Sequence, residues 1–452
     1  MKIKFIAAAI AAVCAQSSFA LDFAATKAVQ LAFEAGTAGN HVVYLTGASA
    51  LRASVPGALQ KICAAGTFTQ FDGSDSNIKA YSCTIGSTLV PAGMAAGDKL
   101  LVGLSVSEGS FSAVISQNAT NFTYDFGAGT KNAQNNQLNF NTTAFTNTSV
   151  FRKQSAGGFM DVQPTLFSNL AEALPSLNVS YTTTPVAAGQ AFGVAVSPAL
   201  YKALQHAQNL TTAEGGACAE NNYSAACQPS ISKTQYASLV SQGNAGYIAD
   251  WSILGVTGGT PVNLCRRVAT SGTQAASNAF FLGKGCSVGS VEPSGAAENN
   301  PGVFNIVENS GSSNVATCLY DSAAADKETK FAIGVISAEN AAATTAWRFV
   351  KLDGVSLFEG VAGGKARQNA IDMKYAFHFE FQTVTRNSAS AAAQGLIAAL
   401  GSAISDPTLT DLTGITIAPG LNAAGEFNAD KPTLIQKAST GGNSCAAATY
   451  VF

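Results

Sequence analysis

Short apolar runs that end in small polar turns alternate along this chain with segments of helical spacing. The first pair is the β-rich run HVVYLTGAS (residues 41–49) and ALRASVPGALQKICAAG (residues 50–66), whose apolar positions recur at helical spacing. Similar pairs are DKLLVGLSVSEGS with FSAVISQ, QAFGVAVSP with ALYKALQHAQ, VNLCRRVATSGT with QAASNAFFLG, and KFAIGVIS with AENAAATTAW. Repeated strand, turn and helix units predict an α/β protein. Ligands of such sheets gather beyond the carboxyl ends of the strands, so the turns are candidate sites.

Three polar segments interrupt this alternation. They cover residues 118–155, rich in Asn, Thr and Gly, residues 208–230, and residues 285–330. Their composition predicts surface loops and hairpins. No strict internal repeat accompanies them.

Two common enzyme motifs are missing from the sequence. There is no HExxH motif and no Walker loop. In FHFEF, residues 377–381, His378 and Glu380 share one strand face and the phenylalanines share the other, which predicts a half-buried strand. The other histidines, His41 and His206, lie far away along the chain, so no catalytic pair or metal-ligand set is predicted, and we expect a protein that is not an enzyme.

The first twenty residues predict export. Residues 1–20 contain two early lysines, an apolar run and a small-residue end, SSFA, the layout of a secretory signal cut after Ala20. Cys14 follows Val13, whereas a lipoprotein signal places Gly or Ala there. No other stretch is long and apolar enough to cross a bilayer. We therefore expect a periplasmic or secreted, soluble chain.

Eight cysteines remain after the signal, an even number in an oxidising compartment. Their spacing suggests Cys63 with Cys83 and Cys218 with Cys227. A zinc site is not expected, because no Cys-x-x-Cys occurs. The sequence leaves open the pairing of Cys265, Cys286, Cys318 and Cys445.

The charge of the chain argues against one class of partner, nucleic acids. The chain of 452 residues has a net charge of -2 and only 12% charged residues, which argues against nucleic acid binding. After removal of the signal, about 430 residues remain, enough for two domains.

The segment CRRVATSGTQ, residues 265–274, places guanidinium and hydroxyl groups where a strand gives way to a helix. Ser271 can cap that helix and Gly272 allows close backbone approach, while Arg267 offers a planar fork for two oxygens. A helix start adds free N–H groups and partial positive charge. The pattern predicts a binding site for an oxyanion. Arg266 is expected on the opposite side of the strand.

The same region carries a family resemblance. SISKTQYASLVSQGNAGYIADWSILG (residues 230–255), then R-x-x-x-S-G-T (residues 267–273), then A-I-G-V-I (residues 332–336), resembles the phosphate-binding proteins of phosphate ABC transporters. Those are type 2 periplasmic binding proteins. The resemblance implies two α/β lobes, each a mixed sheet flanked by helices, with a ligand cleft between them.

Shorter matches extend the resemblance toward the N-terminus. LTGASALR (residues 45–52) is similar to the family's first Gly-rich turn, VSEGSFSAV to its second, and GGFMDVQPTLF to the segment whose aspartate accepts a proton-bearing phosphate oxygen. The ligand-binding residues that the resemblance implies are Ala50, Leu51, Arg52, Ser110 or Ser112, and Asp161 from one lobe, and Arg267, Ser271, Gly272 and Thr273 from the other.

Asp161 carries the selectivity that the resemblance implies. A buried carboxylate accepts a hydrogen bond from a protonated anion but repels one that has no proton, which separates phosphate from sulfate. The chain also departs from the family: Ala269 stands where an acidic residue is usual, and Leu51-Arg52 where Thr-Phe is usual. These departures make the cleft more positive and leave open a phosphorylated or carboxylated ligand.

The resemblance also implies a domain division and partners. Lobe 1 is expected at residues 21–188 plus 353–452 and lobe 2 at residues 189–352, with crossings near 186–195 and 340–353. We expect a monomer without cofactor or metal, which captures phosphate or another small oxyanion and has an ABC transporter membrane complex as its partner. The alternatives are a secreted surface or matrix protein that keeps the fold without transport, and a phosphate-ester hydrolase.

Overall fold

The computed structural model describes most of the chain after the predicted signal. The signal and most of the polar segment 118–155 lie outside the described residues. Described are residues 21–73, 77–107, 109–115, 130–131, 137–139, 154–167, 170, 180–241, 250–257, 261–286, 290–340, 346–358, 368–406, 415–417 and 435–450.

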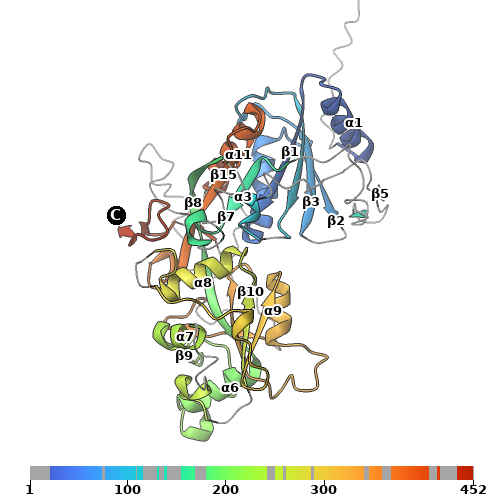
Figure 1. Cartoon of the computed structure of the whole chain (residues 1–452). Helices are drawn as coiled ribbons and strands as arrows, with labels where there is room; N and C mark the ends of the chain where they lie inside the picture. Colours follow the sequence, from blue (N-terminus) through green and yellow to red (C-terminus); the bar gives the residue numbers. More distant parts are fainter. Residues whose placement is uncertain are drawn as a thin grey trace, which may run out of the picture.

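The described part of the chain is built around one large mixed sheet, in agreement with the predicted α/β class (Figure 1). It contains parallel and antiparallel pairs and has 14 strands. In pairing order these are β11 (Phe304–Asn309), β10 (Val262–Arg267), β12 (Ala332–Ser337), β8 (Tyr181–Val196), β15 (His378–Arg386), β7 (Gly157–Met160), β1 (Asn40–Gly47), β4 (Lys99–Ser105), β3 (Ile78–Thr84), β2 (Thr69–Gly73), β6 (Gln137–Asn139) and β5 (Thr130–Lys131), with β13 (Arg348–Phe349) and β16 (Ile415–Ile417) also paired to β8.

The 16-residue strand β8 joins the two sides of this sheet. Its first part pairs with β15, up to Ala191 opposite His378, and its last part pairs with β12, from Phe192 opposite Ser337 onward. We call the strands from β7 to β5 the β1 side, and β12, β10 and β11 the β10 side. Gly193 permits this crowded crossing, because a Cβ there would lie 2.3 Å from a ring carbon of Phe349.

Helices flank both sides of the sheet (Figure 1). On the β1 side, α1 contacts β1 and β4, while α11 contacts α2, β8 and β15. On the β10 side, α8 and α9 contact β10 and β12. The helices are α1 (Phe23–Glu34), α2 (Ser54–Ile62), α3 (Ser112–Ile115), α6 (Pro198–Ala207), α7 (Lys233–Val240), α8 (Gly272–Leu282), α9 (Ser312–Leu319), α10 (Gln368–Ile371) and α11 (Ala391–Ile404).

Short elements complete the described structure. Two small sheets pair β9 (Ser230–Ile231) with β14 (Lys351–Leu352), and β17 (Ala438–Ser439) with β18 (Thr449–Tyr450). The 3₁₀ turns are η1 (Ser49–Arg52), η3 (Pro164–Phe167), η4 (Thr212–Glu214), η5 (Trp251–Leu254) and η6 (Ala296–Glu298).

Most predicted strand and helix pairs correspond to observed elements, because their apolar runs are buried. β1, β4, β8, β10 and β12 are almost wholly buried at their carboxyl ends. One predicted helix differs: after β12 the chain forms a turn at residues 338–340, and residues 341–345 lie outside the described part.

The third polar segment is not a surface loop, so that prediction is wrong. It supplies β11, which pairs in parallel with β10, and α9, which contacts β12 and β10. The segment reads as polar because β11 is an edge strand with exposed positions and α9 buries only Val315 and Leu319 fully. The second polar segment, 208–230, does form turns with one short 3₁₀ helix.

The expectation of a half-buried strand at residues 377–381 is also wrong, because both faces of β15 are covered. Phe377 and Phe381 are fully buried, and Glu380 on the other face is only 1% exposed. The Glu380 carboxylate accepts hydrogen bonds from the residues around β17: Gln436 Nε2 (3.2 Å), Ser439 Oγ (2.8 Å), Thr440 N (2.9 Å), Thr440 Oγ1 (2.8 Å) and Gly442 N (2.7 Å).

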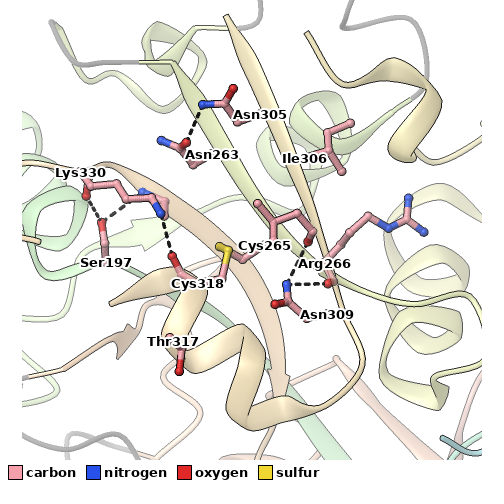
Figure 2. The surroundings of a disulfide bond; sticks show 12 residues. Ser197, Asn263, Cys265, Arg266, Asn305, Ile306, Asn309, Thr317, Cys318 and Lys330 are labelled. Atoms are coloured by element: carbon pink, nitrogen blue, oxygen red, sulfur yellow. Dashed lines mark hydrogen bonds between the residues drawn. A yellow bond between two sulfur atoms is a disulfide. The ribbon is translucent and has the colours of Figure 1, made fainter. Parts of the chain in front are cut away.

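All eight cysteines after residue 20 form disulfides. The two predicted pairs, Cys63–Cys83 and Cys218–Cys227, are confirmed. The open pairings are Cys265–Cys318 and Cys286–Cys445. Figure 2 shows the Cys265–Cys318 bond, which ties β10 to α9 beside the Asn263 to Asn305 hydrogen bond between β10 and β11. Four disulfides are typical of proteins in oxidising compartments.

Candidate functional site

Three chain segments meet where the two sides of the sheet face each other. Asp161 directly follows β7, Ser110 lies in the turn between β4 and α3, and the segment 268–271 connects β10 to α8. The backbone N–H of Phe111 donates a 3.0 Å hydrogen bond to the carbonyl of Thr270. These segments all follow carboxyl ends of strands, so the site lies where an α/β sheet places its ligands.

Ser110 and Asp161 form the centre of this meeting point. The Ser110 hydroxyl donates to Asp161 Oδ2 at 2.8 Å, and the two side chains are 1% and 3% exposed. The second carboxylate oxygen, Asp161 Oδ1, is buried and has no hydrogen-bond partner among the residues that the structure describes. A buried acceptor without a donor is costly, so this atom points to a missing partner.

The start of α8 packs directly on this pair. A Cβ atom on Gly272 would lie 2.2 Å from Asp161 Oδ2 and 2.3 Å from Ser110 Oγ, so only glycine fits here. Ser271 is the N-cap residue of α8, but its side chain makes no capping hydrogen bond, contrary to our expectation. The first turn of α8 therefore relies on other acceptors for its unpaired N–H groups.

Burial dominates the electrostatics of Asp161. Removal from water raises its pKa to about 7, and the negative charge of Glu339 adds to the rise. The Ser110 hydrogen bond and the positive charge of Arg267 oppose it. Near neutral pH this carboxyl can therefore exist with or without its proton, which suits a group that exchanges hydrogen bonds with an acidic ligand.

Arg267 lies at the end of β10, 3% exposed, and is held by the β11–α9 connection. Its Nε donates to the carbonyl of Asn309 (3.2 Å), Nη2 to that of Ser310 (2.8 Å) and Nη1 to Ser312 Oγ (3.1 Å). These three hydrogen bonds orient the guanidinium. A guanidinium has five N–H groups, so two of them are not used by these bonds. Burial lowers its pKa, while Asp161 and Glu339 favour its charge.

Glu339 is a functional candidate that sequence reasoning missed. It follows β12, and its Oε1 accepts a 2.8 Å hydrogen bond from the Ser337 hydroxyl. Part of the residue reaches the surface, but its Oε2 atom is buried and has no hydrogen-bond partner in the described part of the chain. Burial raises the pKa of Glu339, against the Ser337 hydrogen bond and the charge of Arg267.

Ser112 and Thr273 were also expected at the site. Ser112 secures the turn rather than Asp161, since its hydroxyl donates to the carbonyl of Gly109 at 2.7 Å. Thr273 is buried at the start of α8, 3% exposed.

The first Gly-rich turn contributes mainly to the core. Ala50 and Leu51 are 2% and 0% exposed and pack in the hydrophobic core of the β1 side. Arg52 Nη1 donates to Asn77 Oδ1 at 3.2 Å, and its charge acts on Tyr81. These contacts do not connect Arg52 with Asp161.

Arg266 faces away from Arg267, as the strand alternation predicts. Its guanidinium donates to the carbonyl of Ser294 and lies 3.6 Å from Glu308 Oε1. It lines a cavity of about 420 Å³ whose other walls include Leu166 and Lys284. A second cavity of about 880 Å³ lies between α2 and α11. Neither of these two cavities is lined by Asp161 or Arg267.

Two further findings concern the described residues alone. Among them, no group of three or more His, Cys, Asp or Glu side chains could hold a metal ion. Nor does any helix there combine the length and apolar character that a membrane span requires.

Comparisons with known proteins do not identify a family for this chain. No protein-family model matches the chain, and no curated protein matches it. The solved structure of a possible phosphate binding protein from Planctomyces limnophilus aligns over 79% of this chain and 84% of its own, with a TM-score of 0.30 and 11% sequence identity. Similarity this low supports no statement about the fold or the function of this chain.

Proposed function

We propose that the chain is an exported solute-binding protein that captures phosphate, or a related protonated oxyanion, between two lobes. The observation that carries this proposal is the unpartnered, buried Oδ1 of Asp161 beside the start of α8. A protonated anion can donate to Oδ1 while its other oxygens accept hydrogen bonds from helix N–H groups and from Arg267.

The two sides of the sheet are the proposed lobes. In this proposal β8 carries the first crossing, near residues 186–195. The proposed second crossing is the chain just before β15 rather than residues 340–353, because β13 pairs with the end of β8 and β14 pairs with β9. Residues 353–376 then belong to lobe 2 rather than lobe 1.

In this proposal, the contacts that join Ser110 and Asp161 to the start of α8 belong to the closed form of such a protein. Asp161 and Ser110 come from lobe 1, whereas Arg267, Gly272 and Glu339 come from lobe 2. Rotation about β8 and the chain before β15 would separate the two sets and admit a ligand. Closure would then exclude water and strengthen each hydrogen bond to the anion.

Asp161 would supply the selectivity. A carboxylate accepts a hydrogen bond from the P–OH of hydrogenphosphate, but it faces a bare, negatively charged oxygen in sulfate. Loss of the bond together with like-charge repulsion penalises sulfate strongly. Delivery of the captured anion to an ABC transporter is the corresponding role of the proposed protein in the cell.

Thermal unfolding with added anions tests the proposal. Phosphate should raise the unfolding temperature of the wild-type protein by mass action, whereas sulfate at equal concentration should not. Asp161→Asn should reduce the preference for phosphate over sulfate at least tenfold, while the matched change Asp326→Asn, at an exposed position, should not alter it. A protein that no oxyanion stabilises would contradict the proposal.

A further inference from the structure

The candidate site contains a second carboxylate, that of Glu339, and one of its two oxygens has no hydrogen-bond partner among the described residues. Asp161 Oδ1 and Glu339 Oε2 are both buried, neither has a hydrogen-bond partner among the described residues, and they come from opposite sides of the sheet. Each carboxylate has its other oxygen satisfied by a serine: Asp161 Oδ2 by Ser110 and Glu339 Oε1 by Ser337, both at 2.8 Å. Each therefore presents one oriented acceptor.

The charges of the site do not suit an anion that is fully ionised. Among the described residues, Arg267 and Glu339 are the charged groups that act on Asp161, and Arg267 acts on Glu339. With both carboxylates ionised, these three groups sum to one negative charge. Three of the five Arg267 N–H groups are also already used by Asn309, Ser310 and Ser312. A dianion would thus meet net repulsion from the side chains.

Building on the proposed function, we infer that Glu339 is a second hydrogen-bond acceptor for the ligand, so that the site captures an oxyanion carrying two protons. One P–OH donates to Asp161 Oδ1 and the other to Glu339 Oε2. The two unprotonated oxygens accept from the α8 N–H groups and from the free Arg267 N–H groups. For phosphate this species is the monoanion, dihydrogenphosphate.

Binding of a doubly protonated anion requires protons to be taken up from solvent when the free anion carries fewer of them. Above neutral pH, free phosphate is mainly hydrogenphosphate, with one proton, and both carboxylates of the free protein lose their protons as pH rises through their pKa values. Formation of the complex then takes up one proton from solvent for each anion bound. Proton uptake of one per ligand lowers the binding constant for total phosphate about tenfold for each rise of one pH unit.

The raised pKa values of both carboxyls agree with this balance. Burial raises the pKa of Asp161 to about 7 and also raises that of Glu339. The site therefore retains protons readily, whether they are located on the ligand or on the carboxyls.

Isothermal titration of the whole protein with inorganic phosphate tests the inference. Titrations between about pH 7.5 and pH 9 give the slope of affinity with pH, and two buffers of different ionisation enthalpy give the proton count directly. The variants are Glu339→Gln and, as a matched control at an exposed position of the same side, Glu328→Gln. Circular dichroism verifies that each variant is folded.

We expect wild type and Glu328→Gln to take up about one proton per phosphate and to lose about tenfold in affinity per pH unit. Glu339→Gln should take up about none, because a glutamine amide can donate to hydrogenphosphate without an added proton. Wild-type phosphate binding without proton uptake would overturn the inference and leave the proposed function intact. So would equal proton uptake by wild type and Glu339→Gln.

Two other outcomes separate the inference from the proposed function. If wild type binds no phosphate at any pH, the proposed function itself fails. If wild type instead binds magnesium or calcium, and Glu339→Gln abolishes that binding, the paired carboxylates are a cation site and the inference is overturned.

Discussion

The Ser110 hydroxyl donates a 2.8 Å hydrogen bond to Asp161 Oδ2, across 51 residues of sequence and inside a region where both side chains are buried. This bond fixes the Asp161 carboxylate so that Oδ2 is satisfied and Oδ1 is left without a partner. Gly272 packs against both side chains from the other side of the sheet. One hydrogen bond therefore orients the acceptor on which the proposed recognition of a protonated anion depends.

Gly272→Ala should impair the site more than a similar change elsewhere. The new Cβ would lie 2.2 Å from Asp161 Oδ2, so either α8 or the Asp161 segment must move. We expect phosphate affinity to fall at least tenfold and the unfolding temperature to decrease, measured by calorimetry.

Gly295→Ala is the matched control for that change. Its new Cβ would meet its nearest neighbours, Arg266 Nη1 and Glu298 Oε2, at 3.5 and 3.6 Å, which is ordinary contact. Equal effects of the two alanine variants on phosphate affinity would show that the start of α8 does not contact the ligand.

Stability of the ligand-free protein should depend on pH through Asp161. Its pKa is raised to about 7 in the folded state, above the ordinary value of 3.8. The protonated carboxyl is thus favoured by folding, and its stabilising contribution is complete below about pH 4 and is lost as pH rises toward 7. Glu339, whose pKa is also raised, acts in the same direction.

Urea unfolding at about pH 4.5 and pH 8 measures this contribution. Asp161→Asn should reduce the difference in unfolding free energy between the two pH values, whereas Asp326→Asn should leave it unchanged. A difference that is the same in wild type and Asp161→Asn would mean that the Asp161 carboxyl is not buried in solution.

The Cys265–Cys318 disulfide should contribute more stability than Cys218–Cys227. It closes a separation of 53 residues rather than 9, so the chain-entropy estimate is about 4 kcal/mol against about 3 kcal/mol. Replacing each pair with alanines and comparing unfolding temperatures tests the order. Peptide mapping of the unreduced protein provides the control, since a different pairing would contradict the structure directly.

Glu380 should hold the C-terminal segment against β15. Its carboxylate accepts five hydrogen bonds from residues 436–442, two of them from backbone N–H groups. Glu380→Gln replaces one acceptor oxygen with a donor that faces other donors, and we expect a loss on the order of 3 kcal/mol. Limited proteolysis should then cut near residues 436–442, and an unchanged digestion pattern would show that this contact is not required for order.

Local pattern was sufficient to predict much of the fold. The β10 and α8 unit follows from an apolar run, a Ser-Gly-Thr turn and helical spacing, and the same logic identified Arg267 and Gly272 at one end of it. The opposite orientation of Arg266 follows from strand alternation alone.

What the sequence could not predict depends on tertiary contact. Glu339 stands in a short Ala-Glu-Asn turn with no local signal, and its proposed role depends on the position of β12 beside β10, which lets the charge of Arg267 act on it. β11 was missed because an edge strand is exposed on one side and reads as polar. The choice between Ser110 and Ser112 required the geometry of the turn, which directs Ser112 to Gly109.

The most direct test of the account is calorimetric titration of the purified, anion-free protein with phosphate and with sulfate near neutral pH. The account predicts one phosphate per chain, with a dissociation constant in the micromolar range or tighter, and sulfate binding weaker by at least two orders of magnitude. The absence of phosphate binding, or binding of sulfate with equal affinity, would contradict it.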